Sequence, residues 1–179
     1  MIEMKNVAYL GLGSNIGNRI KNIFYALSFL RDNSFISIND ISSFYETSPV
    51  GYKQKYFYNA VIKVYVNIEP HDLLLYVKQI EYTLGRKKKL RWGPRIIDID
   101  ILFFGNRIIN DINLTIPHKE IENRLFVLIP LNEISSNFVH PILNKKISDI
   151  LINRLQILRY QNQKIKTVIN KLRIIKKLV

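Results

Sequence analysis

The sequence predicts an α+β fold in which helices pack on one side of a largely antiparallel sheet, with a helical extension at the C-terminal end. Three observations indicate this class. Some segments carry apolar residues at spacings of three and four, and others are short apolar runs or alternate with a period of two. These segments follow the order β-α-β-β-α-β, and 47% of the 179 residues are hydrophobic, enough for one core. The order is typical of two split β-α-β units, which form a ferredoxin-like sandwich.

The first part of the chain predicts a strand, a helix and two further strands. Residues 7–12 are a short apolar run closed by a turn, which is typical of a buried strand. An amphipathic pattern begins at Arg19, and Asn18 is suited to be the N-cap of that helix. Residues 36–45 are rich in β-branched side chains, and residues 57–66 alternate cleanly, so both predict strands.

A second helix and a final strand complete the expected order. Pro70 is suited to the first turn of the helix, and Gly85 is suited to its end. Residues 95–104 form an apolar strand that ends in a turn at Gly105 and Asn106. With both helices on one side, we expect the other sheet face to be free to carry a site.

The composition and charge of the chain exclude some classes of protein and indicate possible partners. The chain has no cysteine, which excludes a disulfide framework and a Cys-ligated zinc site. Glu3 within the short apolar start argues against a secretory signal, and no run is long enough to span a bilayer, so we expect a cytoplasmic protein. The net charge of +13 indicates nucleic acid, an anionic membrane or a phosphorylated ligand as partner, unless it only reflects a general bias toward lysine.

Asp98 and Asp100 lie two residues apart on a predicted strand, so they share one face while Ile99 points to the other. Neighbouring carboxylates repel each other unless a cation lies between them. Mg²⁺ is commonly bound by one or two carboxylates together with water and substrate phosphates. The pair therefore indicates a magnesium site, with two solvated carboxylates or a pair neutralised by arginine as the alternatives.

A basic segment leads directly into this pair. It contains Arg86, Lys87, Lys88, Lys89, Arg91 and Arg95. A polyphosphate needs such cations beside its metal, because Mg²⁺ bridges phosphate oxygens while Arg and Lys offset the remaining charge. The segment alone would indicate an ordinary solvated loop, but next to the aspartates it favours a phosphate site.

Several short motifs occur in order along residues 7–142. They are Gly11-Leu12-Gly13-Ser14-Asn15, Tyr45-Glu46-Thr47-Ser48-Pro49-Val50-Gly51, Asn59-Ala60, Gly85-Arg86, Arg91-Trp92-Gly93-Pro94-Arg95, Asp98-x-Asp100, Ile116-Pro117-His118, Asn123-Arg124-Leu125-Phe126 and Pro130-Leu131. The ordered set resembles the 6-hydroxymethyl-7,8-dihydropterin pyrophosphokinase family. Its most specific part is the run that begins with Arg91 and ends with Asp100.

The resemblance implies a reaction and a set of site residues. In that reaction the pterin hydroxymethyl oxygen attacks the β-phosphorus of ATP and AMP leaves, a step in folate biosynthesis. The residues implied for catalysis are Arg86, Arg95, Asp98 and Asp100, and the two aspartates would hold two Mg²⁺. Those implied for ATP are Glu81, Lys88, Arg91, Trp92, His118 and Arg124. Those implied for the pterin are Thr47, Ser48, Pro49, Val50, Phe57, Asn59 and Phe126.

Some of these assignments have simpler alternatives. Without the resemblance, Phe57 and Phe126 would be ordinary core aromatics, and a lone histidine such as His118 would be a surface residue. Lys88 stands where the family has an arginine. Because lysine cannot make the planar bidentate contact of arginine, phosphate binding is expected to be weaker. The polar segment 85–94, with Trp92 as a cap, is expected to act as a lid that excludes water.

The resemblance fades after about residue 148, where a basic amphipathic segment follows. Its apolar residues recur at helical spacing among lysines and arginines. We therefore predict one pterin pyrophosphokinase domain over residues 1–160 and a basic amphipathic C-terminal helix over residues 161–179. The helix is expected to pack on the domain or on a second copy, with an anionic membrane or nucleic acid as the alternative surface.

ATP and a reduced pterin are the expected partners, with no specific nucleic acid and no transmembrane segment. We expect a monomer, and a dimer formed through the C-terminal helix is the alternative. Two other functions stay open from the residues alone. A nucleic-acid-binding module would explain the net charge but not the aspartate pair, and a different metal-dependent phosphotransferase or nuclease would use the same carboxylates.

Overall fold

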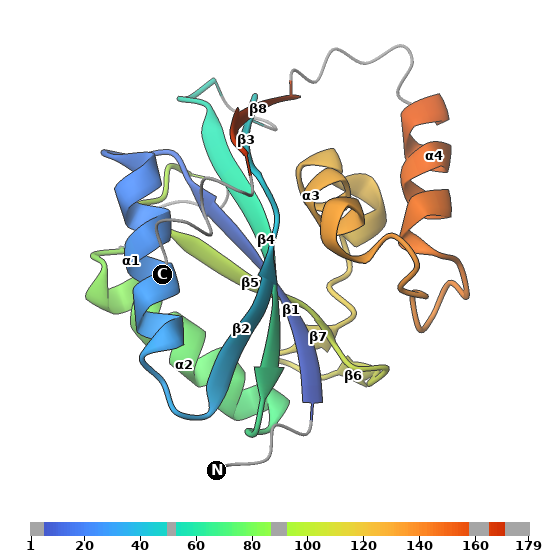
Figure 1. The fold of residues 1–179 in the computed structure, drawn as a ribbon, viewed down its shortest axis with the longest axis horizontal. Helices are drawn as coiled ribbons and strands as arrows, with labels where there is room; N and C mark the ends of the chain where they lie inside the picture. The colour runs from blue at the N-terminus through green and yellow to red at the C-terminus, as the bar shows by residue number, and fades with distance from the viewer. Residues whose placement is uncertain (1–5, 50–52, 87–92, 158–164, 171–179) are drawn as a thin grey trace.

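The computed structural model describes residues 6–49, 53–86, 93–157 and 165–170. Its main sheet is antiparallel and has six strands in the order β5-β1-β4-β3-β8, with β2 also paired to β4 (Figure 1). The strands of this sheet are β1 (Asn6–Ser14), β2 (Ile36–Ile41), β3 (Phe44–Thr47), β4 (Phe57–Val66), β5 (Asp98–Phe104) and β8 (Ile165–Ile169). The remaining elements are α1 (Arg19–Arg31), α2 (Pro70–Thr83), β6 (Ile109–Asn110), β7 (Thr115–Ile116), the 3₁₀ helix η1 (Ile121–Asn123), α3 (Leu125–Ser135) and α4 (Ile147–Ile157). The predicted α+β class and the largely antiparallel sheet are confirmed.

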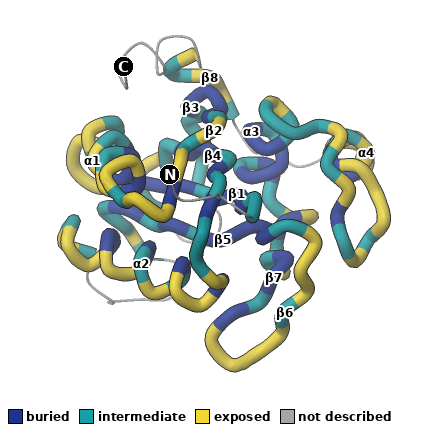
Figure 2. Tube along the Cα trace, turned by 60° about the horizontal axis from the view of Figure 1, so that its bottom comes forward, coloured by how far each residue is buried: buried dark blue, intermediate teal, exposed yellow. Residues whose placement is uncertain are grey.

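Helices lie on both faces of the sheet, so the expectation of helices on one side is wrong. Helices α1 and α2 cover one face, whereas α3 packs on β4 from the other face and α4 packs on α3 (Figure 1). The end of β5 explains the second layer, because Leu102, Phe103 and Phe104 are all buried, with Leu102 and Phe103 in one core cluster and Phe104 in the other. A run that is apolar on both faces needs cover on both. Figure 2 shows the buried positions concentrated in the central strands.

The predicted helix ends match the structure. Asn18 caps α1, with its side-chain oxygen accepting a hydrogen bond from the Lys21 backbone N–H at 3.1 Å. Pro70 is the first residue of α2, and Gly85 follows its C-terminus with a φ of 89°, a conformation that favours glycine. Among the described residues, no helix is both long and apolar enough to cross a bilayer.

The strand predicted over residues 36–45 is two strands, β2 and β3. Both pair with β4, which is long enough to accommodate them end to end. At the break, the Ser42 backbone N–H donates to the Val61 carbonyl at 2.9 Å, and the Val61 N–H donates to the Ser42 hydroxyl oxygen at 3.0 Å. The serine side chain thus replaces a backbone acceptor and redirects the chain into β3.

The helix predicted over residues 161–179 is wrong for the five residues that form β8. These residues pair antiparallel with β3. Three of them, Ile165, Val168 and Ile169, have helical spacing but are β-branched, and the free edge of β3 offers them backbone partners. Residues 161–164 and 171–179 of the predicted helix, and the predicted boundary at residue 160, lie outside the described residues.

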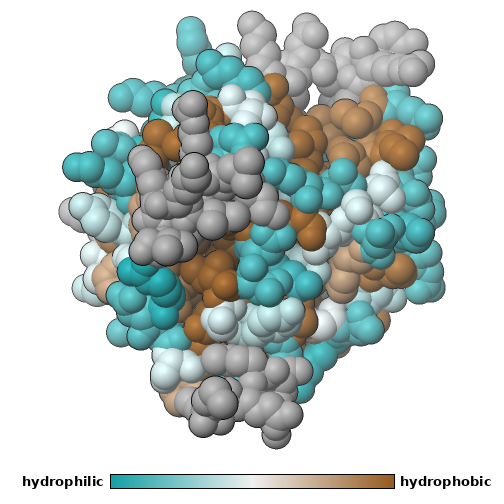
Figure 3. Space-filling model, in the orientation of Figure 1, coloured by the Kyte–Doolittle hydropathy of each residue, from teal (hydrophilic) through white to brown (hydrophobic). Residues whose placement is uncertain are grey.

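Helix α4 is the least embedded of the four α-helices of the described chain. It packs on α3 and η1, and its residues Ile152, Leu155 and Ile157 are 54%, 45% and 65% exposed. Figure 3 shows hydrophobic side chains at the surface over α3 and α4. Helix α4 therefore packs on other helices, whereas α1 and α2 pack on the sheet itself.

His140 is buried at the turn before α4, although a lone histidine is more often a surface residue. Its Nδ1 accepts hydrogen bonds from the Ile142 and Leu143 backbone N–H groups at 3.2 and 3.3 Å, and its ring meets the edge of Phe103. Burial lowers the pKa of His140 below its ordinary value of 6.5. The neutral ring is therefore part of the fold, because a protonated Nδ1 cannot accept these bonds.

This burial predicts a loss of stability in acid. Below pH 6.5 the unfolded chain takes up a proton at His140 more readily than the folded chain, so the free energy of unfolding falls as the pH decreases through that value. Urea denaturation at pH 7.5 and pH 5.5 checks this for the wild type and for His140→Asn. The variant is expected to show a smaller difference between the two pH values, and an equal difference would contradict the assignment.

Candidate active site

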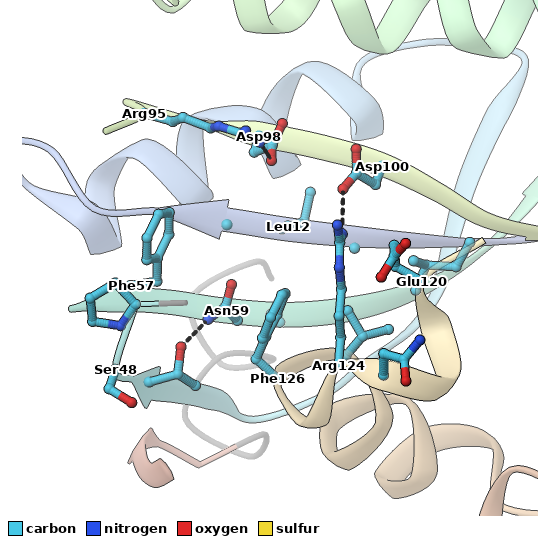
Figure 4. Close-up of a pocket in the computed structure, with 18 of the residues that line it drawn as sticks. Leu12, Ser48, Phe57, Asn59, Arg95, Asp98, Asp100, Glu120, Arg124 and Phe126 are labelled. Atoms are coloured by element: carbon cyan, nitrogen blue, oxygen red, sulfur yellow. Dashed lines mark hydrogen bonds and ion pairs between the residues drawn. The ribbon is translucent and has the colours of Figure 1, made fainter. Parts of the chain in front are cut away.

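A cavity of about 450 Å³ opens between the sheet and the start of α3 (Figure 4). Its walls come from β1, β5, the end of β3, the start of β4, and the segment that joins η1 to α3. Most of the described site residues from the sequence prediction line it: Thr47, Ser48, Pro49, Phe57, Asn59, Arg95, Asp98, Asp100, Arg124 and Phe126. The cavity therefore brings together side chains that are far apart in the sequence.

Asp98 and Asp100 point from β5 toward the cavity, as the alternation predicted (Figure 4). Arg95 donates a hydrogen bond to one oxygen of Asp98, and Arg86 forms an ion pair with the other. Burial alone would raise the pKa of Asp98, but Arg95 and Arg86 outweigh it and hold that pKa below its usual range. The Asp98 carboxylate is thus ionised and fixed in position.

Asp100 is held much more loosely. Its Oδ2 lies 3.8 Å from Arg124 Nη1 and 4.0 Å from His118 Nε2. Burial lowers the pKa of His118, although the Asp100 charge acts in the opposite direction. His118 is not part of the cavity lining and lies behind Asp100. Asp100 therefore has oxygen lone pairs available for a ligand.

Glu81 on α2 is buried next to β5, on which Asp98 and Asp100 lie, and its contacts connect the two elements. It accepts hydrogen bonds from the Ile99 backbone N–H at 2.7 Å and from Lys78 Nζ at 2.8 Å, and it forms an ion pair with Arg86. Burial raises the pKa of Glu81, while Lys78 and Arg86 oppose the shift. Glu81 therefore anchors Arg86 beside Asp98 and does not line the cavity itself.

The aspartate pair is a suitable ligand set for Mg²⁺. Within the described ranges, no three or more His, Asp or Glu side chains form a group that could hold a metal ion unaided. Two carboxylates facing a cavity still fit Mg²⁺, which uses few protein ligands and takes the rest from water and phosphate oxygens. Asp98 Oδ1 also has no hydrogen-bond partner within the described part of the chain, despite its ion pair with Arg86.

The other end of the cavity is a cleft with two aromatic rings. Asn59 lies between Phe57 and Phe126 and donates a hydrogen bond from Nδ2 to Thr47 Oγ1 at 2.7 Å (Figure 4). Asn59 and Thr47 are buried, whereas both phenylalanines remain partly exposed to the cavity. The rings therefore offer surfaces to a ligand, and Phe126 also packs against a core cluster.

Four predicted site residues lie outside the described residues. They are Val50, Lys88, Arg91 and Trp92. Most of the predicted lid lies there too. The roles of these residues, and the effect of lysine at position 88, stay predictions.

The structure adds positioning residues that the sequence prediction missed. Asn15 accepts a hydrogen bond from the Arg95 backbone N–H at 2.7 Å through Oδ1, and donates from its own N–H to the Arg95 carbonyl at 3.0 Å. The available sequence signal was its place at the end of the Gly11-Leu12-Gly13-Ser14-Asn15 motif. Glu133 on α3 accepts hydrogen bonds from the Ser43 N–H and hydroxyl, both at 2.8 Å, and from the Tyr45 hydroxyl at 2.9 Å. It joins α3 to β3, and no sequence signal indicated that pairing.

Glycines form part of the cavity floor. Gly11 and Gly13 are paired in register with Asp100 and Asp98 on the neighbouring strand β5. Their two-residue spacing was visible in the sequence but had been interpreted only as a motif. Without side chains, they leave room for a ligand directly beside the carboxylates.

Fold and site together define a class of protein: an α+β protein with an acidic pair and arginines next to an aromatic cleft, the arrangement of a phosphotransfer enzyme. The chain belongs to the 7,8-dihydro-6-hydroxymethylpterin-pyrophosphokinase (HPPK) family, whose sequence model matches residues 9–136.

Named relatives agree with this membership. The chain is 48% identical over 130 residues to the bifunctional protein FolKE of Lactococcus lactis subsp. cremoris, a match that covers 72% of this chain and 37% of that protein. It is 43% identical over 132 residues to the 2-amino-4-hydroxy-6-hydroxymethyldihydropteridine pyrophosphokinase of Bacillus subtilis, covering 73% of this chain and 79% of that one. The chain thus spans about a third of the bifunctional relative and most of the Bacillus subtilis pyrophosphokinase.

A solved structure supports the fold independently. A triple mutant of HPPK-DHPS from Plasmodium falciparum superimposes with a TM-score of 0.73 at 20% identity, over 87% of this chain and 45% of that chain. At this identity the likeness concerns the fold alone.

Proposed function

We propose that this chain transfers the diphosphate of ATP to the hydroxymethyl group of 6-hydroxymethyl-7,8-dihydropterin, giving AMP and the dihydropterin diphosphate in folate biosynthesis. Membership of the HPPK family supports this reaction. The observation that carries the proposal is a single cavity with Asp98 and Asp100 at one end and Asn59 between two phenylalanines at the other. Such a cavity suits a ligand pair made of a flat polar ring and a polyphosphate.

The aromatic end is suited to the pterin. Phe57 and Phe126 provide faces for the ring, and offset stacking contributes about 0.5–1.5 kcal/mol beyond the burial of area. Asn59 is held by Thr47, which fixes the orientation of its amide toward the polar edge of a ring. Ser48 and Pro49 form the adjoining wall. Together these residues would position the hydroxymethyl group toward the aspartates.

The charged end is suited to the polyphosphate. Asp98 and Asp100 would hold Mg²⁺, and two ions are expected from the family resemblance. Bound Mg²⁺ would bridge phosphate oxygens and offset the charge that develops during transfer. Arg95 lines the cavity and Arg86 supports Asp98 from behind, so the two guanidinium groups stabilise anionic oxygens at this end.

The remaining roles extend this proposal. Arg124 lies between Asp100 and the Phe126 ring, with its guanidinium 5.7 Å from the ring centroid, so it is suited to contact phosphate close to the pterin. His118, uncharged at neutral pH because burial lowers its pKa, would support ATP binding next to Asp100. Lys88, Arg91 and Trp92 would close over the nucleotide as a lid. We further propose a cytoplasmic monomer with ATP and the reduced pterin as its ligands.

The test is the identity of the nucleotide product. Purified full-length chain is incubated with ATP, Mg²⁺ and 6-hydroxymethyl-7,8-dihydropterin, and the products are separated by ion-exchange chromatography. AMP in equal amount to the pterin diphosphate is expected, with no AMP when the pterin is omitted. ADP as the product would indicate a different phosphotransferase, and cleavage of an added nucleic acid would indicate a nuclease.

A further inference from the structure

We infer that the C-terminal strand β8 is a positioning element for the pterin site, because it clamps β3, the strand that leads into one wall of the cavity. The inference rests on the proposed function. It concerns residues 165–169, which lie beyond the region matched by the family model, residues 9–136. Figure 1 shows β8 alongside β3 at the edge of the sheet.

Strand β3 is short and depends on its neighbours. Its residues Phe44–Thr47 pair with β4 on one side and with β8 on the other. The pairing with β8 extends to the last residue of β3, where Thr47 is opposite Ile165. A short strand with one partner frays readily at its end, whereas a second ladder holds both edges. β8 thus restrains β3 at the end nearest the cavity.

An ion-pair network reinforces this ladder. The Glu46 carboxylate on β3 lies 3.1 Å from Lys166 Nζ on β8 and 3.0 Å from Arg19 Nη1 on α1. Arg19 in turn donates to the Tyr56 carbonyl at 2.8 Å and lies over the Tyr58 ring. These two residues flank Phe57 in the sequence. The network therefore connects β8, through β3, to both neighbours of an aromatic residue of the cavity.

The link from β3 to the ligand is direct. Thr47 accepts the hydrogen bond that orients Asn59, and Ser48 and Pro49 continue from β3 into the cavity wall. A wall that is already ordered before binding loses less conformational freedom when the ligand enters. β8 is therefore expected to increase affinity for the pterin without contacting it, and to leave ATP binding unaffected.

The experiment uses point variants in the full-length chain. Thr167 is exposed and pairs with Tyr45, so Thr167→Ala keeps the backbone N–H, whereas Thr167→Pro removes it and disfavours the strand. Lys166→Glu is a second variant, which places a negative charge beside Glu46 at an exposed position. The readouts are the Kd of 6-hydroxymethylpterin, measured by its fluorescence, the Kd of ATP, the Tm, and amide hydrogen exchange of residues 44–47.

Thr167→Pro and Lys166→Glu are expected to raise the Kd of the pterin by about tenfold, which is a loss of about 1.4 kcal/mol of binding free energy. Exchange of residues 44–47 should become faster, and Thr167→Ala should bind like the wild type. An unchanged Kd in both variants would overturn the inference. An equal loss of ATP affinity would also overturn it, because it would mean that β8 only stabilises the fold. If the chain binds the pterin but forms no AMP, the proposed function is contradicted, and the effect of β8 on pterin binding can still be measured.

Discussion

Asp100→Ala is expected to reduce kcat by about three orders of magnitude or more, because loss of one carboxylate ligand removes several kcal/mol of metal-dependent stabilisation of the transition state. The fold should be retained. Within the described residues, the ion pairs of Asp100 are the long ones to Arg124 and His118, at 3.8 and 4.0 Å, so no close ion pair is broken there when the carboxylate is removed. Asp100 is therefore the cleaner of the two aspartates to test.

Asp98→Ala is expected to have a similar effect on kcat but a larger effect on stability. Asp98 is the acceptor for Arg95 and an ion-pair partner of Arg86, and its removal leaves the partly buried Arg86 guanidinium with Glu81 as its remaining ion-pair partner among the described residues. A charged hydrogen bond of this kind contributes about 1.5–3 kcal/mol, reduced here because Arg95 is partly exposed to solvent. The sequence predicted the same role for both aspartates, whereas the structure shows that Asp98 has close arginine partners and Asp100 has only long contacts among the described residues.

Steady-state kinetics over a range of Mg²⁺ concentrations, together with thermal unfolding, measures both effects. Glu120→Ala is the matched control, since Glu120 is an acidic residue that lines the same cavity from a different segment (Figure 4). It should change kcat by less than about tenfold, the range expected for a rim charge outside the metal site. Near-normal turnover in Asp100→Ala, or an equal loss in Glu120→Ala, would refute the role of the pair as metal ligands.

Local patterns predicted the parts of the fold that depend on neighbours in the sequence. Alternation along residues 95–104 predicted that Asp98 and Asp100 share the cavity face, and the caps at Asn18 and Gly85 follow from side-chain chemistry and backbone freedom. β8 could not be predicted in this way. Its apolar residues fit a helix equally well, and only the free edge of β3 selects the strand.

The same distinction between local and long-range signals applies to the residues of the candidate site. Residues within a recognisable motif, such as Arg95 and Asn59, were found because the order of motifs resembles a family. Glu133 lies in no such motif, and its partner Tyr45 is distant in the sequence. Asn15 lies in the first motif, but its support of Arg95 was missed because Arg95 is also distant in the sequence. A hydrogen bond between separate segments leaves no periodic signal. Positioning residues of this kind therefore emerge only once the tertiary structure is known.

Gly13 is the position at which a small change is expected to have the second large effect. A Cβ built on Gly13 would lie 3.1 Å from Asn59 Oδ1, 3.9 Å from the Asp98 Cβ and 4.0 Å from the Phe57 ring. Gly13 thus sits where the aromatic and charged ends of the cavity meet, and a side chain there would occupy the path between pterin and phosphate. Its φ is not in the left-handed region, so the expected effect comes from space and not from backbone strain.

Gly13→Ala is expected to raise the KM for the pterin by about tenfold, since the Asn59 amide must shift and its bond to Thr47 weakens, a loss on the order of 1.4 kcal/mol. Gly13→Val is expected to lower kcat/KM by about a hundredfold or more, because a branched side chain blocks the approach of the two substrates. Both variants should fold, since replacing glycine in a strand also restricts the unfolded chain, which adds about 0.4–1 kcal/mol of stability.

Gly11→Ala is the matched control for this effect. Gly11 lies on the same strand and lines the same cavity, but a Cβ there would meet only Leu102 side-chain carbons at 3.4–3.7 Å, which is ordinary contact. It shares the backbone change of Gly13→Ala and should therefore show the same gain in stability, with a KM for the pterin within about threefold of the wild type. Equal losses in Gly11→Ala and Gly13→Ala would mean that the strand as a whole, and not the junction at Gly13, controls binding. Because only Gly13 approaches Asn59, Asp98 and Phe57 at once, the contrast between the two glycines reports directly on where the substrates meet.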